Sequence, residues 1–346
     1  MKIFLKELEL SINDDVYFDS RLGGIYAGLE CGEYQEFLFE DSLGTVSHSF
    51  IIRPINERLK NKTNYYDLTT PYGYGGPLIL ECNDQDRSKL IEHFFRAFAD
   101  YCSENNIVSE FIRFHPLADN ANDFGSFYSA EIHNYTVATN LFSYDDPFMS
   151  EFSKSCRKNV RRGLRAGLDY VIDTNPTSLE EFYKIYYETM DRNQAKDIYY
   201  FDEKYFEKFI ETMPENIITC KVIYQDKTIA MGFYLRTDEI LHTHLSGTLS
   251  DYLDLSPAYI LRYGLLQWGL ENGIKLIHHG GGTTGSEKDS LFLFKKQFGR
   301  NTILPFYLGK KIWNQSVYDQ LVKINEVNPK TGFFPAYRSL DYYQNR

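Results

Sequence analysis

The chain has 346 residues, of which 43% are hydrophobic and 25% charged, and its formal net charge is −11 at pH 7. A chain of this length and composition can form two domains with substantial cores, which excludes the disordered, collagen-like and disulfide-scaffold classes. Its apolar runs are too short to cross a bilayer, and acidic residues interrupt the first ten positions, so we expect no transmembrane segment and no signal peptide. The five widely spaced cysteines match no metal-ligand pattern, which predicts a reducing, cytoplasmic location.

Two segments repeat the same order of expected elements. Residues 43–116 and 226–282 each read strand, strand, glycine-bearing loop, amphipathic helix and short strand. The helix ends align, since ENNI at 104–107 corresponds to ENGI at 271–274, 167 residues further on. We therefore expect a tandem duplication in the α+β or α/β class, each half a mixed twisted sheet flanked by helices. A polar, proline-bearing stretch near 140–155 places the boundary, which gives domains 1–150 and 151–346.

The local patterns support these elements. Residues 46–52 and 229–235 are rich in β-branched and aromatic residues, as strands are. Ser256 and Pro257 predict a helix start with an N-cap and a first-turn proline, and Gly273 predicts the end of that helix. The expected apolar stripes of the two equivalent helices are Leu90, Ile91, Phe94, Phe95 and Phe98, and Ile260, Leu261, Leu265 and Leu270.

A basic helix is expected at residues 152–168 of this acidic protein. Its cations recur at helical spacing on one face: Lys154, Arg157, Lys158, Arg161, Arg162 and Arg165. Beside them runs an apolar stripe of Phe152, Cys156, Val160 and Leu164. One interpretation is a solvated face offset by acidic neighbours. The other is a site for phosphates of a carrier, nucleotide or tRNA end, held by Arg157, Arg161 and Arg165. The net negative charge argues against broad nucleic-acid coating and against a DNA partner.

A glycine-rich loop follows the second short strand. Gly280, Gly281 and Gly282 let backbone approach a ligand closely, and their N–H groups can form an anion nest. The next segment, 286–299, has a helical apolar stripe of Leu291, Phe294 and Phe298 with Lys295 and Lys296 beside it. Neither the P-loop pattern nor the dinucleotide fingerprint is present. His242, His244, His278 and His279 could surround a metal ion, but without an H-E-x-x-H helix we favour satisfied or groove histidines and expect no metal.

Taken in order, these motifs resemble the FemAB-like branch of the GNAT acyltransferase superfamily. The matching stretches are SKSCRKNVRRGLRAGLDYVI (153–172), YYETMDRNQAKDIYYFDEKYFEKF (186–209), SPAYILRYGLLQWGLENG (256–273) with IHHGGG (277–282), and DSLFLFKKQFG (289–299). The resemblance covers about residues 40–312 and implies two GNAT-like domains with a cleft between or beside them. It also implies an acceptor side in the first domain, and a donor side with the catalytic element in the second.

The implied chemistry is acyl transfer, in which an amine or hydroxyl attacks an ester or thioester and an oxyanion develops at the acyl carbonyl. Lys295 matches the lysine of the family's Phe-Lys element, which includes Phe294, and is the candidate for stabilising that oxyanion. Lys296 is the adjacent alternative. A substrate-assisted base, or a tyrosine or histidine in the cleft, could take the proton.

The resemblance leaves two donors open, acyl-CoA (such as acetyl-CoA) and aminoacyl-tRNA. The GNAT pyrophosphate pattern [QR]-x-x-G-x-[GA] is not visible before residues 256–273, which weighs against acyl-CoA. Residues 173–220 are too short for the helical-hairpin arm of some relatives, but armless members exist, so aminoacyl-tRNA remains a candidate.

On the acceptor side, TPYGYGGP (70–77) and IRFHP (112–116) end corresponding strands. The glycines would allow a tight turn that presents Tyr72 and Tyr74, while Arg113 and Arg192 could hold a phosphate or carboxylate. Turn packing for the tyrosines and an internal ion pair for Arg113 are the structural alternatives. The full set of expected substrate-binding residues is Tyr72, Tyr74, Arg113, His115, Arg192, His244, Ser246, Gly280, Gly281 and Gly282.

Three functions follow as hypotheses. The first is a cytoplasmic acyltransferase that modifies an amino-sugar, nucleotide-sugar, peptidoglycan or lipid-linked cell-envelope precursor. The second is a strict Fem-type ligase, which would use aminoacyl-tRNA, contact the tRNA 3′ end and act on a peptidoglycan precursor. The third is a GNAT-fold binding protein without turnover.

Overall fold

The computed structural model describes residues 8–55, 63–328 and 332–339 of the chain. The chain forms two compact units, each made of two segments: the first contains Met1–Val16 and Asn134–Pro305, and the second contains Tyr17–His133 and Phe306–Arg346. These bounds differ from the expected division into 1–150 and 151–346, because the C-terminal segment groups with the first half of the sequence. The assignment of acceptor and donor sides to the two halves stays a prediction.

The sheet of the second unit has the strand order β1-β2-β3-β5-β12, with β4 paired to β2. All pairs are antiparallel except β3 with β5, which are parallel. The strands are β1 (Glu33–Asp41), β2 (Gly44–Ile55), β3 (Tyr65–Thr69), β4 (Leu78–Cys82), β5 (Ile107–Arg113) and β12 (Ile303–Ile312). The helices are α2 (Ser20–Leu29), α3 (Arg87–Glu104), α4 (Asn120–Phe124) and α11 (Gln315–Ile324).

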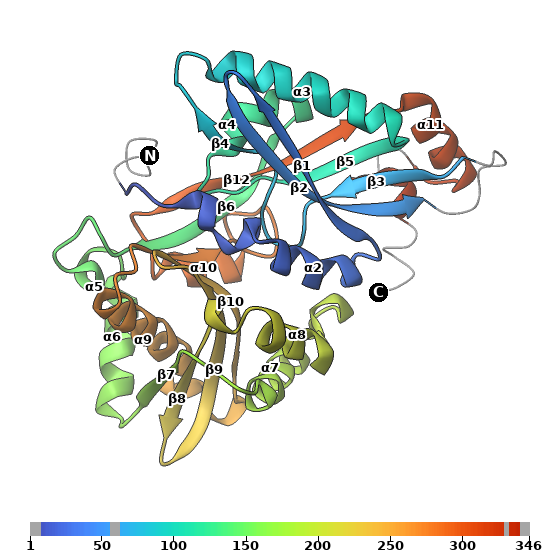
Figure 1. Ribbon diagram of the computed structural model, residues 1–346. Helices are drawn as coiled ribbons and strands as arrows, with labels where there is room; N and C mark the ends of the chain where they lie inside the picture. The colour runs from blue at the N-terminus through green and yellow to red at the C-terminus, as the bar shows by residue number, and fades with distance from the viewer. Residues whose placement is uncertain (1–7, 56–62, 329–331, 340–346) are drawn as a thin grey trace. The chain divides into compact units, whose positions relative to one another are not determined.

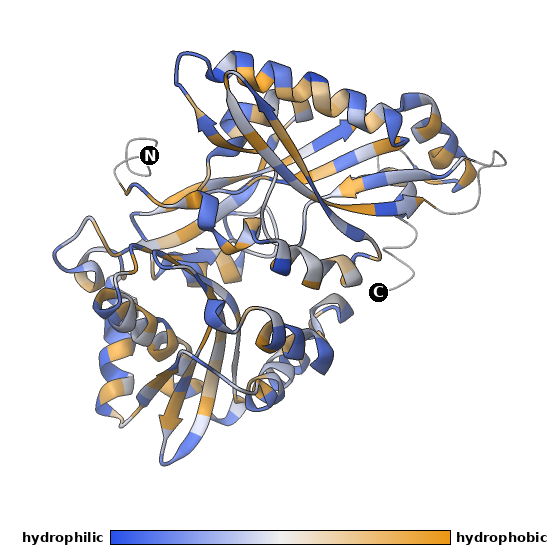
Figure 2. Cartoon of the chain, viewed as in Figure 1, coloured by the Kyte–Doolittle hydropathy of each residue, from blue (hydrophilic) through white to orange (hydrophobic). Residues whose placement is uncertain are grey.

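Helices cover both faces of this sheet. The long helix α3 lies along β1, β2 and β5 (Figure 1), and its residues Leu90, Phe94 and Phe98 are fully buried against the sheet. Figure 2 shows hydrophobic and hydrophilic residues alternating along α3, as the sequence pattern predicts. On the other face, α11 packs its apolar side against Val108 of β5. The second unit therefore has one core on each side of its sheet.

The sheet of the first unit has the strand order β6-β11-β10-β9-β8-β7. Only β10 and β11 are parallel. The strands are β6 (Glu131–Asn140), β7 (Asp169–Asp173), β8 (Ile217–Tyr224), β9 (Lys227–Arg236), β10 (Ile240–Thr248) and β11 (Leu276–Gly280). The helices are α5 (Pro147–Ser150), α6 (Lys154–Arg165), α7 (Glu180–Arg192), α8 (Glu203–Thr212), α9 (Pro257–Glu271) and α10 (Ser290–Lys296).

Two pairs of helices cover this second sheet. Helices α6 and α9 lie on one face and α7 and α8 on the other (Figure 1). Ile260, Leu261 and Leu265 of α9 are buried against β8 and β9, together with Cys156 and Val160 of α6. On the opposite face, Phe182 of α7 and Phe206 of α8 contact Phe233 of β9.

The strands of the two units repeat one pairing scheme, and each unit includes one strand from the other half of the sequence. In β2-β3-β5 and in β9-β10-β11 an antiparallel pair is followed by a parallel one. Each set is then extended by an antiparallel strand that comes from the other half of the sequence. β12 pairs with β5, whereas β6, which follows β5 along the chain, pairs with β11. The expected mixed α+β fold is confirmed, and the exchange explains why the compact units are not contiguous in sequence.

Several residue-level expectations need correction. Leu164 of α6, Leu270 of α9 and Leu291 of α10 are 37%, 45% and 38% exposed. In α10 the buried position is Phe292 rather than Leu291, its neighbour about 100° around the helix. Ser256 has a left-handed backbone conformation and makes no side-chain cap. Among the described residues, no helix is long and apolar enough to span a membrane.

Candidate functional site

Lys295 is held at the glycine loop of the first unit. Its ammonium donates a hydrogen bond to the carbonyl oxygen of Gly281 (Nζ to O, 2.7 Å), and the side chain is half-buried. Burial and the nearby charge of Arg262 lower the pKa of Lys295 to about 7, against an opposing effect of Asp289. Lys296, one position further, is exposed and lies over the ring of Phe292. The two adjacent lysines therefore have different environments.

Asp289 organises the loop that carries Gly281. Its Oδ1 accepts the backbone N–H of Phe292, so it is the N-cap of α10. Its Oδ2 accepts the backbone N–H and the hydroxyl of both Thr283 and Thr284. Burial alone would raise the pKa of Asp289, but these hydrogen bonds outweigh it and hold the pKa well below its usual value.

Glycine is required at two positions of this loop. Gly280 has φ +72°, in the region that side chains disfavour. A Cβ on Gly282 would lie 2.4 Å from Oδ1 of Asp289. The same loop borders a small surface recess, whose lining is Asn134, Tyr135, Gly282, Thr284, Gly285, Ser286, Glu287 and Phe292.

A buried cation lies behind the loop. Arg262 of α9 is 6% exposed, and its Nη1 donates to the hydroxyl of Tyr234 on β9 at 2.9 Å. Within the described part of the chain, its Nε has no hydrogen-bond partner and no carboxylate forms an ion pair with it. Its charge acts on Lys295 and on His279, the residue that precedes Gly280. Arg262 and Tyr234 were not among the expected site residues, and His279 was considered only as one of four histidines that could surround a metal ion or be satisfied by neighbours.

The hydrogen bonds of His279 fix its tautomer. The hydroxyl of Thr139 donates to the carbonyl of Phe298 at 2.7 Å, so it accepts from Nε2 of His279 at 2.8 Å. Nδ1 of His279 is then the unprotonated nitrogen, and it has no partner among the described residues. Burial, together with the charges of Arg262 and Lys295, holds the pKa of His279 well below its usual value. His279 is therefore neutral.

His242 and His244 lie on β10, and His278 lies on β11 next to His279. His242 and His278 face each other on β10 and β11, with 3.3 Å between their Nδ1 atoms, and Nε2 of His242 contacts Asp15 at 2.8 Å. His244 contacts the hydroxyl of Tyr205 at 2.7 Å, and burial with the influence of His242 lowers the pKa of His244 to about 3.

Strands β10 and β11 separate beyond His242. Their pairing covers three positions and ends at His242 with His278, whereas β10 stays paired with β9 as far as Thr248. A bulge interrupts the β9 pairing between Thr243 and Leu245. From residue 243 onward, no strand in the described part of the chain pairs with the edge of β10 that faces β11. This edge includes the expected binding residues His244 and Ser246.

The basic helix is confirmed as α6, with Ser153 as its N-cap. No acidic residue in the described ranges forms an ion pair with any of its six cations. Arg157 and Arg161 both reach Met149 at the end of α5, where the carbonyl accepts from Arg157 at 3.0 Å and Sδ lies 3.8 Å from Arg161. Arg165 donates to the carbonyl of Arg161. The described hydrogen bonds of these arginines go to backbone carbonyls, a thioether and a hydroxyl, and phosphate binding by this face stays a prediction.

In the second unit the turn that carries Tyr72 and Tyr74 lies beside the chain segment that carries Arg113 and His115. Residue 75 forms a β-bridge with residue 114, which places the 70–77 turn beside the end of β5. Tyr74 packs edge-on against His115 at 5.5 Å between ring centroids, and Tyr72 contacts Tyr26.

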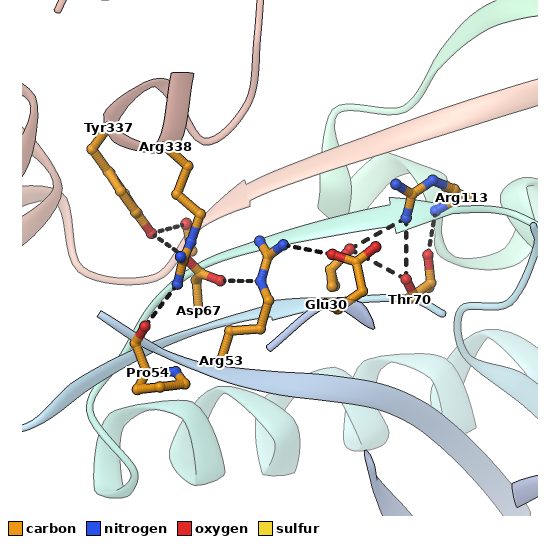
Figure 3. A network of polar contacts seen from close by, with 10 residues as sticks. Glu30, Arg53, Pro54, Asp67, Thr70, Arg113, Tyr337 and Arg338 are labelled. Carbon is orange, nitrogen blue, oxygen red and sulfur yellow. Dashed lines mark hydrogen bonds and ion pairs between the residues drawn. The ribbon is translucent and has the colours of Figure 1, made fainter. Parts of the chain in front are cut away.

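Arg113 has no ion pair in the described part of this unit, so the expected alternative of an internal salt bridge is not seen. It donates to the hydroxyl of Thr69 and the carbonyl of Thr70 (Figure 3). The neighbouring Arg53 instead forms ion pairs with the carboxylates of Glu30 and Asp67. Burial lowers the pKa of Arg113. A partly buried guanidinium without a carboxylate partner suits recognition of an anion.

The remaining expected residues have ordinary packing partners. Arg192 donates to the carbonyl of Thr248 at 2.7 Å and to the hydroxyl of Ser250, so it ties the end of α7 to the end of β10. Phe294 contacts Tyr259 and Phe298 and anchors α10 beside Lys295. The functional roles of both residues stay predictions.

Comparison with known proteins agrees with this picture. Residues 150–288 match the family described as "Acetyltransferase (GNAT) domain". Over 175 residues the chain is 23% identical to UDP-N-acetylmuramoylpentapeptide-lysine N(6)-alanyltransferase of Weissella viridescens, covering 50% of this chain and 51% of that protein. The chain thus spans about half the length of this curated relative.

Two solved structures share the fold over most of the chain. FemX matches with a TM-score of 0.62 at 12% identity, covering 86% of this chain and 92% of FemX. The C-terminal domain of a putative lysylphosphatidylglycerol synthetase from Agrobacterium fabrum matches with a TM-score of 0.52 at 14% identity, covering 88% and 92%. The expected resemblance to GNAT and Fem-type proteins is confirmed.

Proposed function

We propose that this chain, whose residues 150–288 match the family described as "Acetyltransferase (GNAT) domain", transfers an acyl or aminoacyl group from an activated donor to an amine or hydroxyl acceptor. The observation that carries the proposal is the placement of Lys295. Its amine is half-buried, bonded to the Gly281 carbonyl and close to the charges of Arg262 and Asp289. A group in that setting can meet the charge that develops on an acyl oxygen, where a fully solvated lysine could not act as strongly.

The transfer itself needs few protein groups. The acceptor nitrogen or oxygen attacks the acyl carbon, the carbonyl oxygen becomes an oxyanion beside Lys295, and the bond from carbon to the donor's oxygen or sulfur then breaks. Cysteine nucleophiles are disfavoured, since burial raises the pKa of Cys220 to about 12 and raises those of Cys156 and Cys102 as well. Direct attack by the acceptor is therefore the simplest path.

The edge of β10 that faces β11 is a candidate binding site for the donor, because no described strand pairs with it beyond His242. Backbone groups beyond His242 face the gap toward β11 and can bond an extended chain, as an edge strand does. Gly280–Gly282 lie at the end of β11, so the acyl group of such a donor would approach the glycine loop. The relative in Weissella viridescens carries an alanyltransferase name, which supports an aminoacyl group and a peptidoglycan precursor as acceptor.

A transfer assay tests this proposal and separates the donors. The purified protein is incubated with UDP-N-acetylmuramoylpentapeptide and either acetyl-CoA or alanyl-tRNA, and the mass of the acceptor is followed. A gain of one alanyl group would support aminoacyl transfer, and a gain of one acetyl group would support the CoA-dependent alternative. Absence of product with both donors, and with amino-sugar and lipid-linked acceptors, would favour a binding protein without turnover.

A further inference from the structure

Arg262 is a buried cation without a counter-ion among the described residues. It projects from α9 into a core that also contains Ile260, Leu261 and Leu265. The Tyr234 hydroxyl accepts one of its N–H groups, and the guanidinium carbon lies 5.5 Å from the centre of that ring. A neutral phenol and an aromatic face stabilise the guanidinium without neutralising it. The full positive charge therefore acts on the groups around it.

The groups on which this charge acts come from four elements. They are Lys295 on α10, His279 on β11, Tyr234 on β9 and Cys220 on β8. The carboxylate that acts on Lys295 is that of Asp289, but its oxygens accept hydrogen bonds from Phe292, Thr283 and Thr284. Lys295 itself is bonded to a carbonyl oxygen and forms no ion pair with any described residue. Burial of Lys295, and after it the nearby charge of Arg262, therefore disfavours the ammonium form against the opposing effect of Asp289.

His279 does not compete for a proton at this point. Its Nε2–H is committed to Thr139, and a second proton on Nδ1 would place an imidazolium next to both Arg262 and Lys295. His244 is likewise held neutral, with its Nε2 at the Tyr205 hydroxyl. Of Lys295, His279 and His244, only Lys295 changes charge near neutral pH.

We propose that Arg262 is a positioning residue that keeps Lys295 as a neutral amine, so that Lys295 can take the proton of the attacking acceptor. This inference rests on the proposed acyl transfer. As the acceptor nitrogen bonds to the acyl carbon, its proton moves to Nζ of Lys295. The new ammonium then lies beside the oxyanion, and it returns the proton to the donor's oxygen or sulfur as that bond breaks. No external oxidant, reductant or metal is needed, and Lys295 ends as the amine.

The low pKa of Lys295, about 7, agrees with this assignment, because half of the population is then the free amine near neutral pH. An ordinary lysine, with a pKa near 10.5, would be almost entirely protonated. The same residue can thus act first as base and then as the charge that stabilises the intermediate.

The test measures the titration of Lys295 directly and needs no substrate. The protein is labelled with a short pulse of isotope-coded acetic anhydride across pH 5–11, and peptides from α10 are quantified by mass spectrometry. Lys296, the exposed neighbour, is the internal control. In wild type we expect half-maximal labelling of Lys295 near pH 7. Half-maximal labelling of Lys295 near the ordinary lysine value of 10.5 would overturn the proposal, whatever the variants do.

Three variants then isolate the charge of Arg262. Arg262→Gln should move half-maximal labelling of Lys295 upward by about one pH unit. Arg262→Lys and Tyr234→Phe keep the charge and should leave that value low. Equal profiles for wild type and Arg262→Gln, or an equal shift in Arg262→Lys and Arg262→Gln, would refute the electrostatic effect.

The transfer assay completes the argument. If Lys295 is the base, the ascending limb of turnover against pH must move upward in Arg262→Gln by the same amount as the labelling profile. A labelling shift without a shift of that limb would refute the proton-transfer step while leaving the proposed function standing. Absence of transfer in wild type with every donor would refute the proposed function, and the labelling result would still stand.

Discussion

Asp289→Asn should loosen the glycine loop without unfolding the protein. Asparagine is as good an N-cap as aspartate, so the bond from Phe292 N–H to Oδ1 can persist. The amide nitrogen, however, replaces Oδ2, which accepts the N–H and hydroxyl groups of Thr283 and Thr284. An amide N–H cannot accept these bonds, so all four donors lose their partner.

The magnitude follows from the charge of the acceptor. A hydrogen bond to an ionised group contributes about 1.5–3 kcal/mol, and bonds that share one oxygen are not additive. Thr283 and Thr284 are exposed enough that water can replace part of the loss. We therefore expect the free energy of opening the loop to fall by about 2–3 kcal/mol, which corresponds to roughly 30- to 150-fold more frequent opening.

The effect should depend on pH with a definite sign. The pKa of Asp289 in the folded protein lies below its usual 3.8, so its stabilising contribution is fully present above the unfolded-state value. It is lost as the pH falls through the folded-state pKa. The difference between wild type and Asp289→Asn should therefore be constant at neutral pH and shrink in acid below pH 3.8.

Hydrogen exchange at the Thr283, Thr284 and Phe292 amides measures this opening. Asp289→Asn should accelerate exchange at Thr283 and Thr284 most, with Phe292 changed less because its cap survives. The control is Thr284→Val, which removes one hydroxyl donor and leaves the backbone bonds, so its effect should be about 1 kcal/mol or less. Unchanged exchange at Thr283 and Thr284 in Asp289→Asn would mean that this carboxylate does not organise the loop.

Two further perturbations test neighbouring features. Reversing Arg161 and Arg165 to Glu on α6 should leave the fold intact and weaken binding of deacylated tRNA or CoA at least tenfold at low salt. The loss should be smaller at high salt, because salt screens the charges. Equal binding by wild type and variant at low salt would mean that this face is only a solvated surface. Gly282→Ala should push Asp289 away, since the added Cβ would lie 2.4 Å from its Oδ1, and the same three loop amides should exchange faster; protection equal to wild type would show that the loop relaxes freely.

The sequence predicted the elements better than their assembly. Periodicity located α3, α6 and α9, and the repeat correctly paired the two strand–helix–strand segments. It could not show that β6 and β12 each complete the sheet of the other half, because a strand's own alternation does not specify its partner. The expected boundary near residue 150 was placed from a polar, proline-bearing stretch, whereas each compact unit combines two separate segments of the sequence.

The candidate site was also only partly predictable. Gly280–Gly282 stood out as a run of glycines and Lys295 by its match to the family's Phe-Lys element, and a hydrogen bond from Lys295 to Gly281 joins them. Arg262 was overlooked because a single arginine in a helix is usually solvated. The sequence did contain a sign of its burial, because Arg262 lies three residues before Leu265 and four before Leu266. Both leucines are buried, so this spacing places the arginine on the apolar face of α9. The function of Asp289 depends on a turn that brings Thr283 and Thr284 onto one oxygen, which no spacing rule anticipates.

The most direct test of the central claim compares Lys295→Met with Lys296→Met in the transfer assay. The two lysines are adjacent, but only Lys295 is bonded to the glycine loop. Circular dichroism would first show that both variants are folded. We predict that Lys295→Met loses about 10²- to 10³-fold in turnover, with donor binding largely retained, while Lys296→Met stays within a few-fold of wild type. Near-wild-type turnover by Lys295→Met, or equal losses in both variants, would contradict the account.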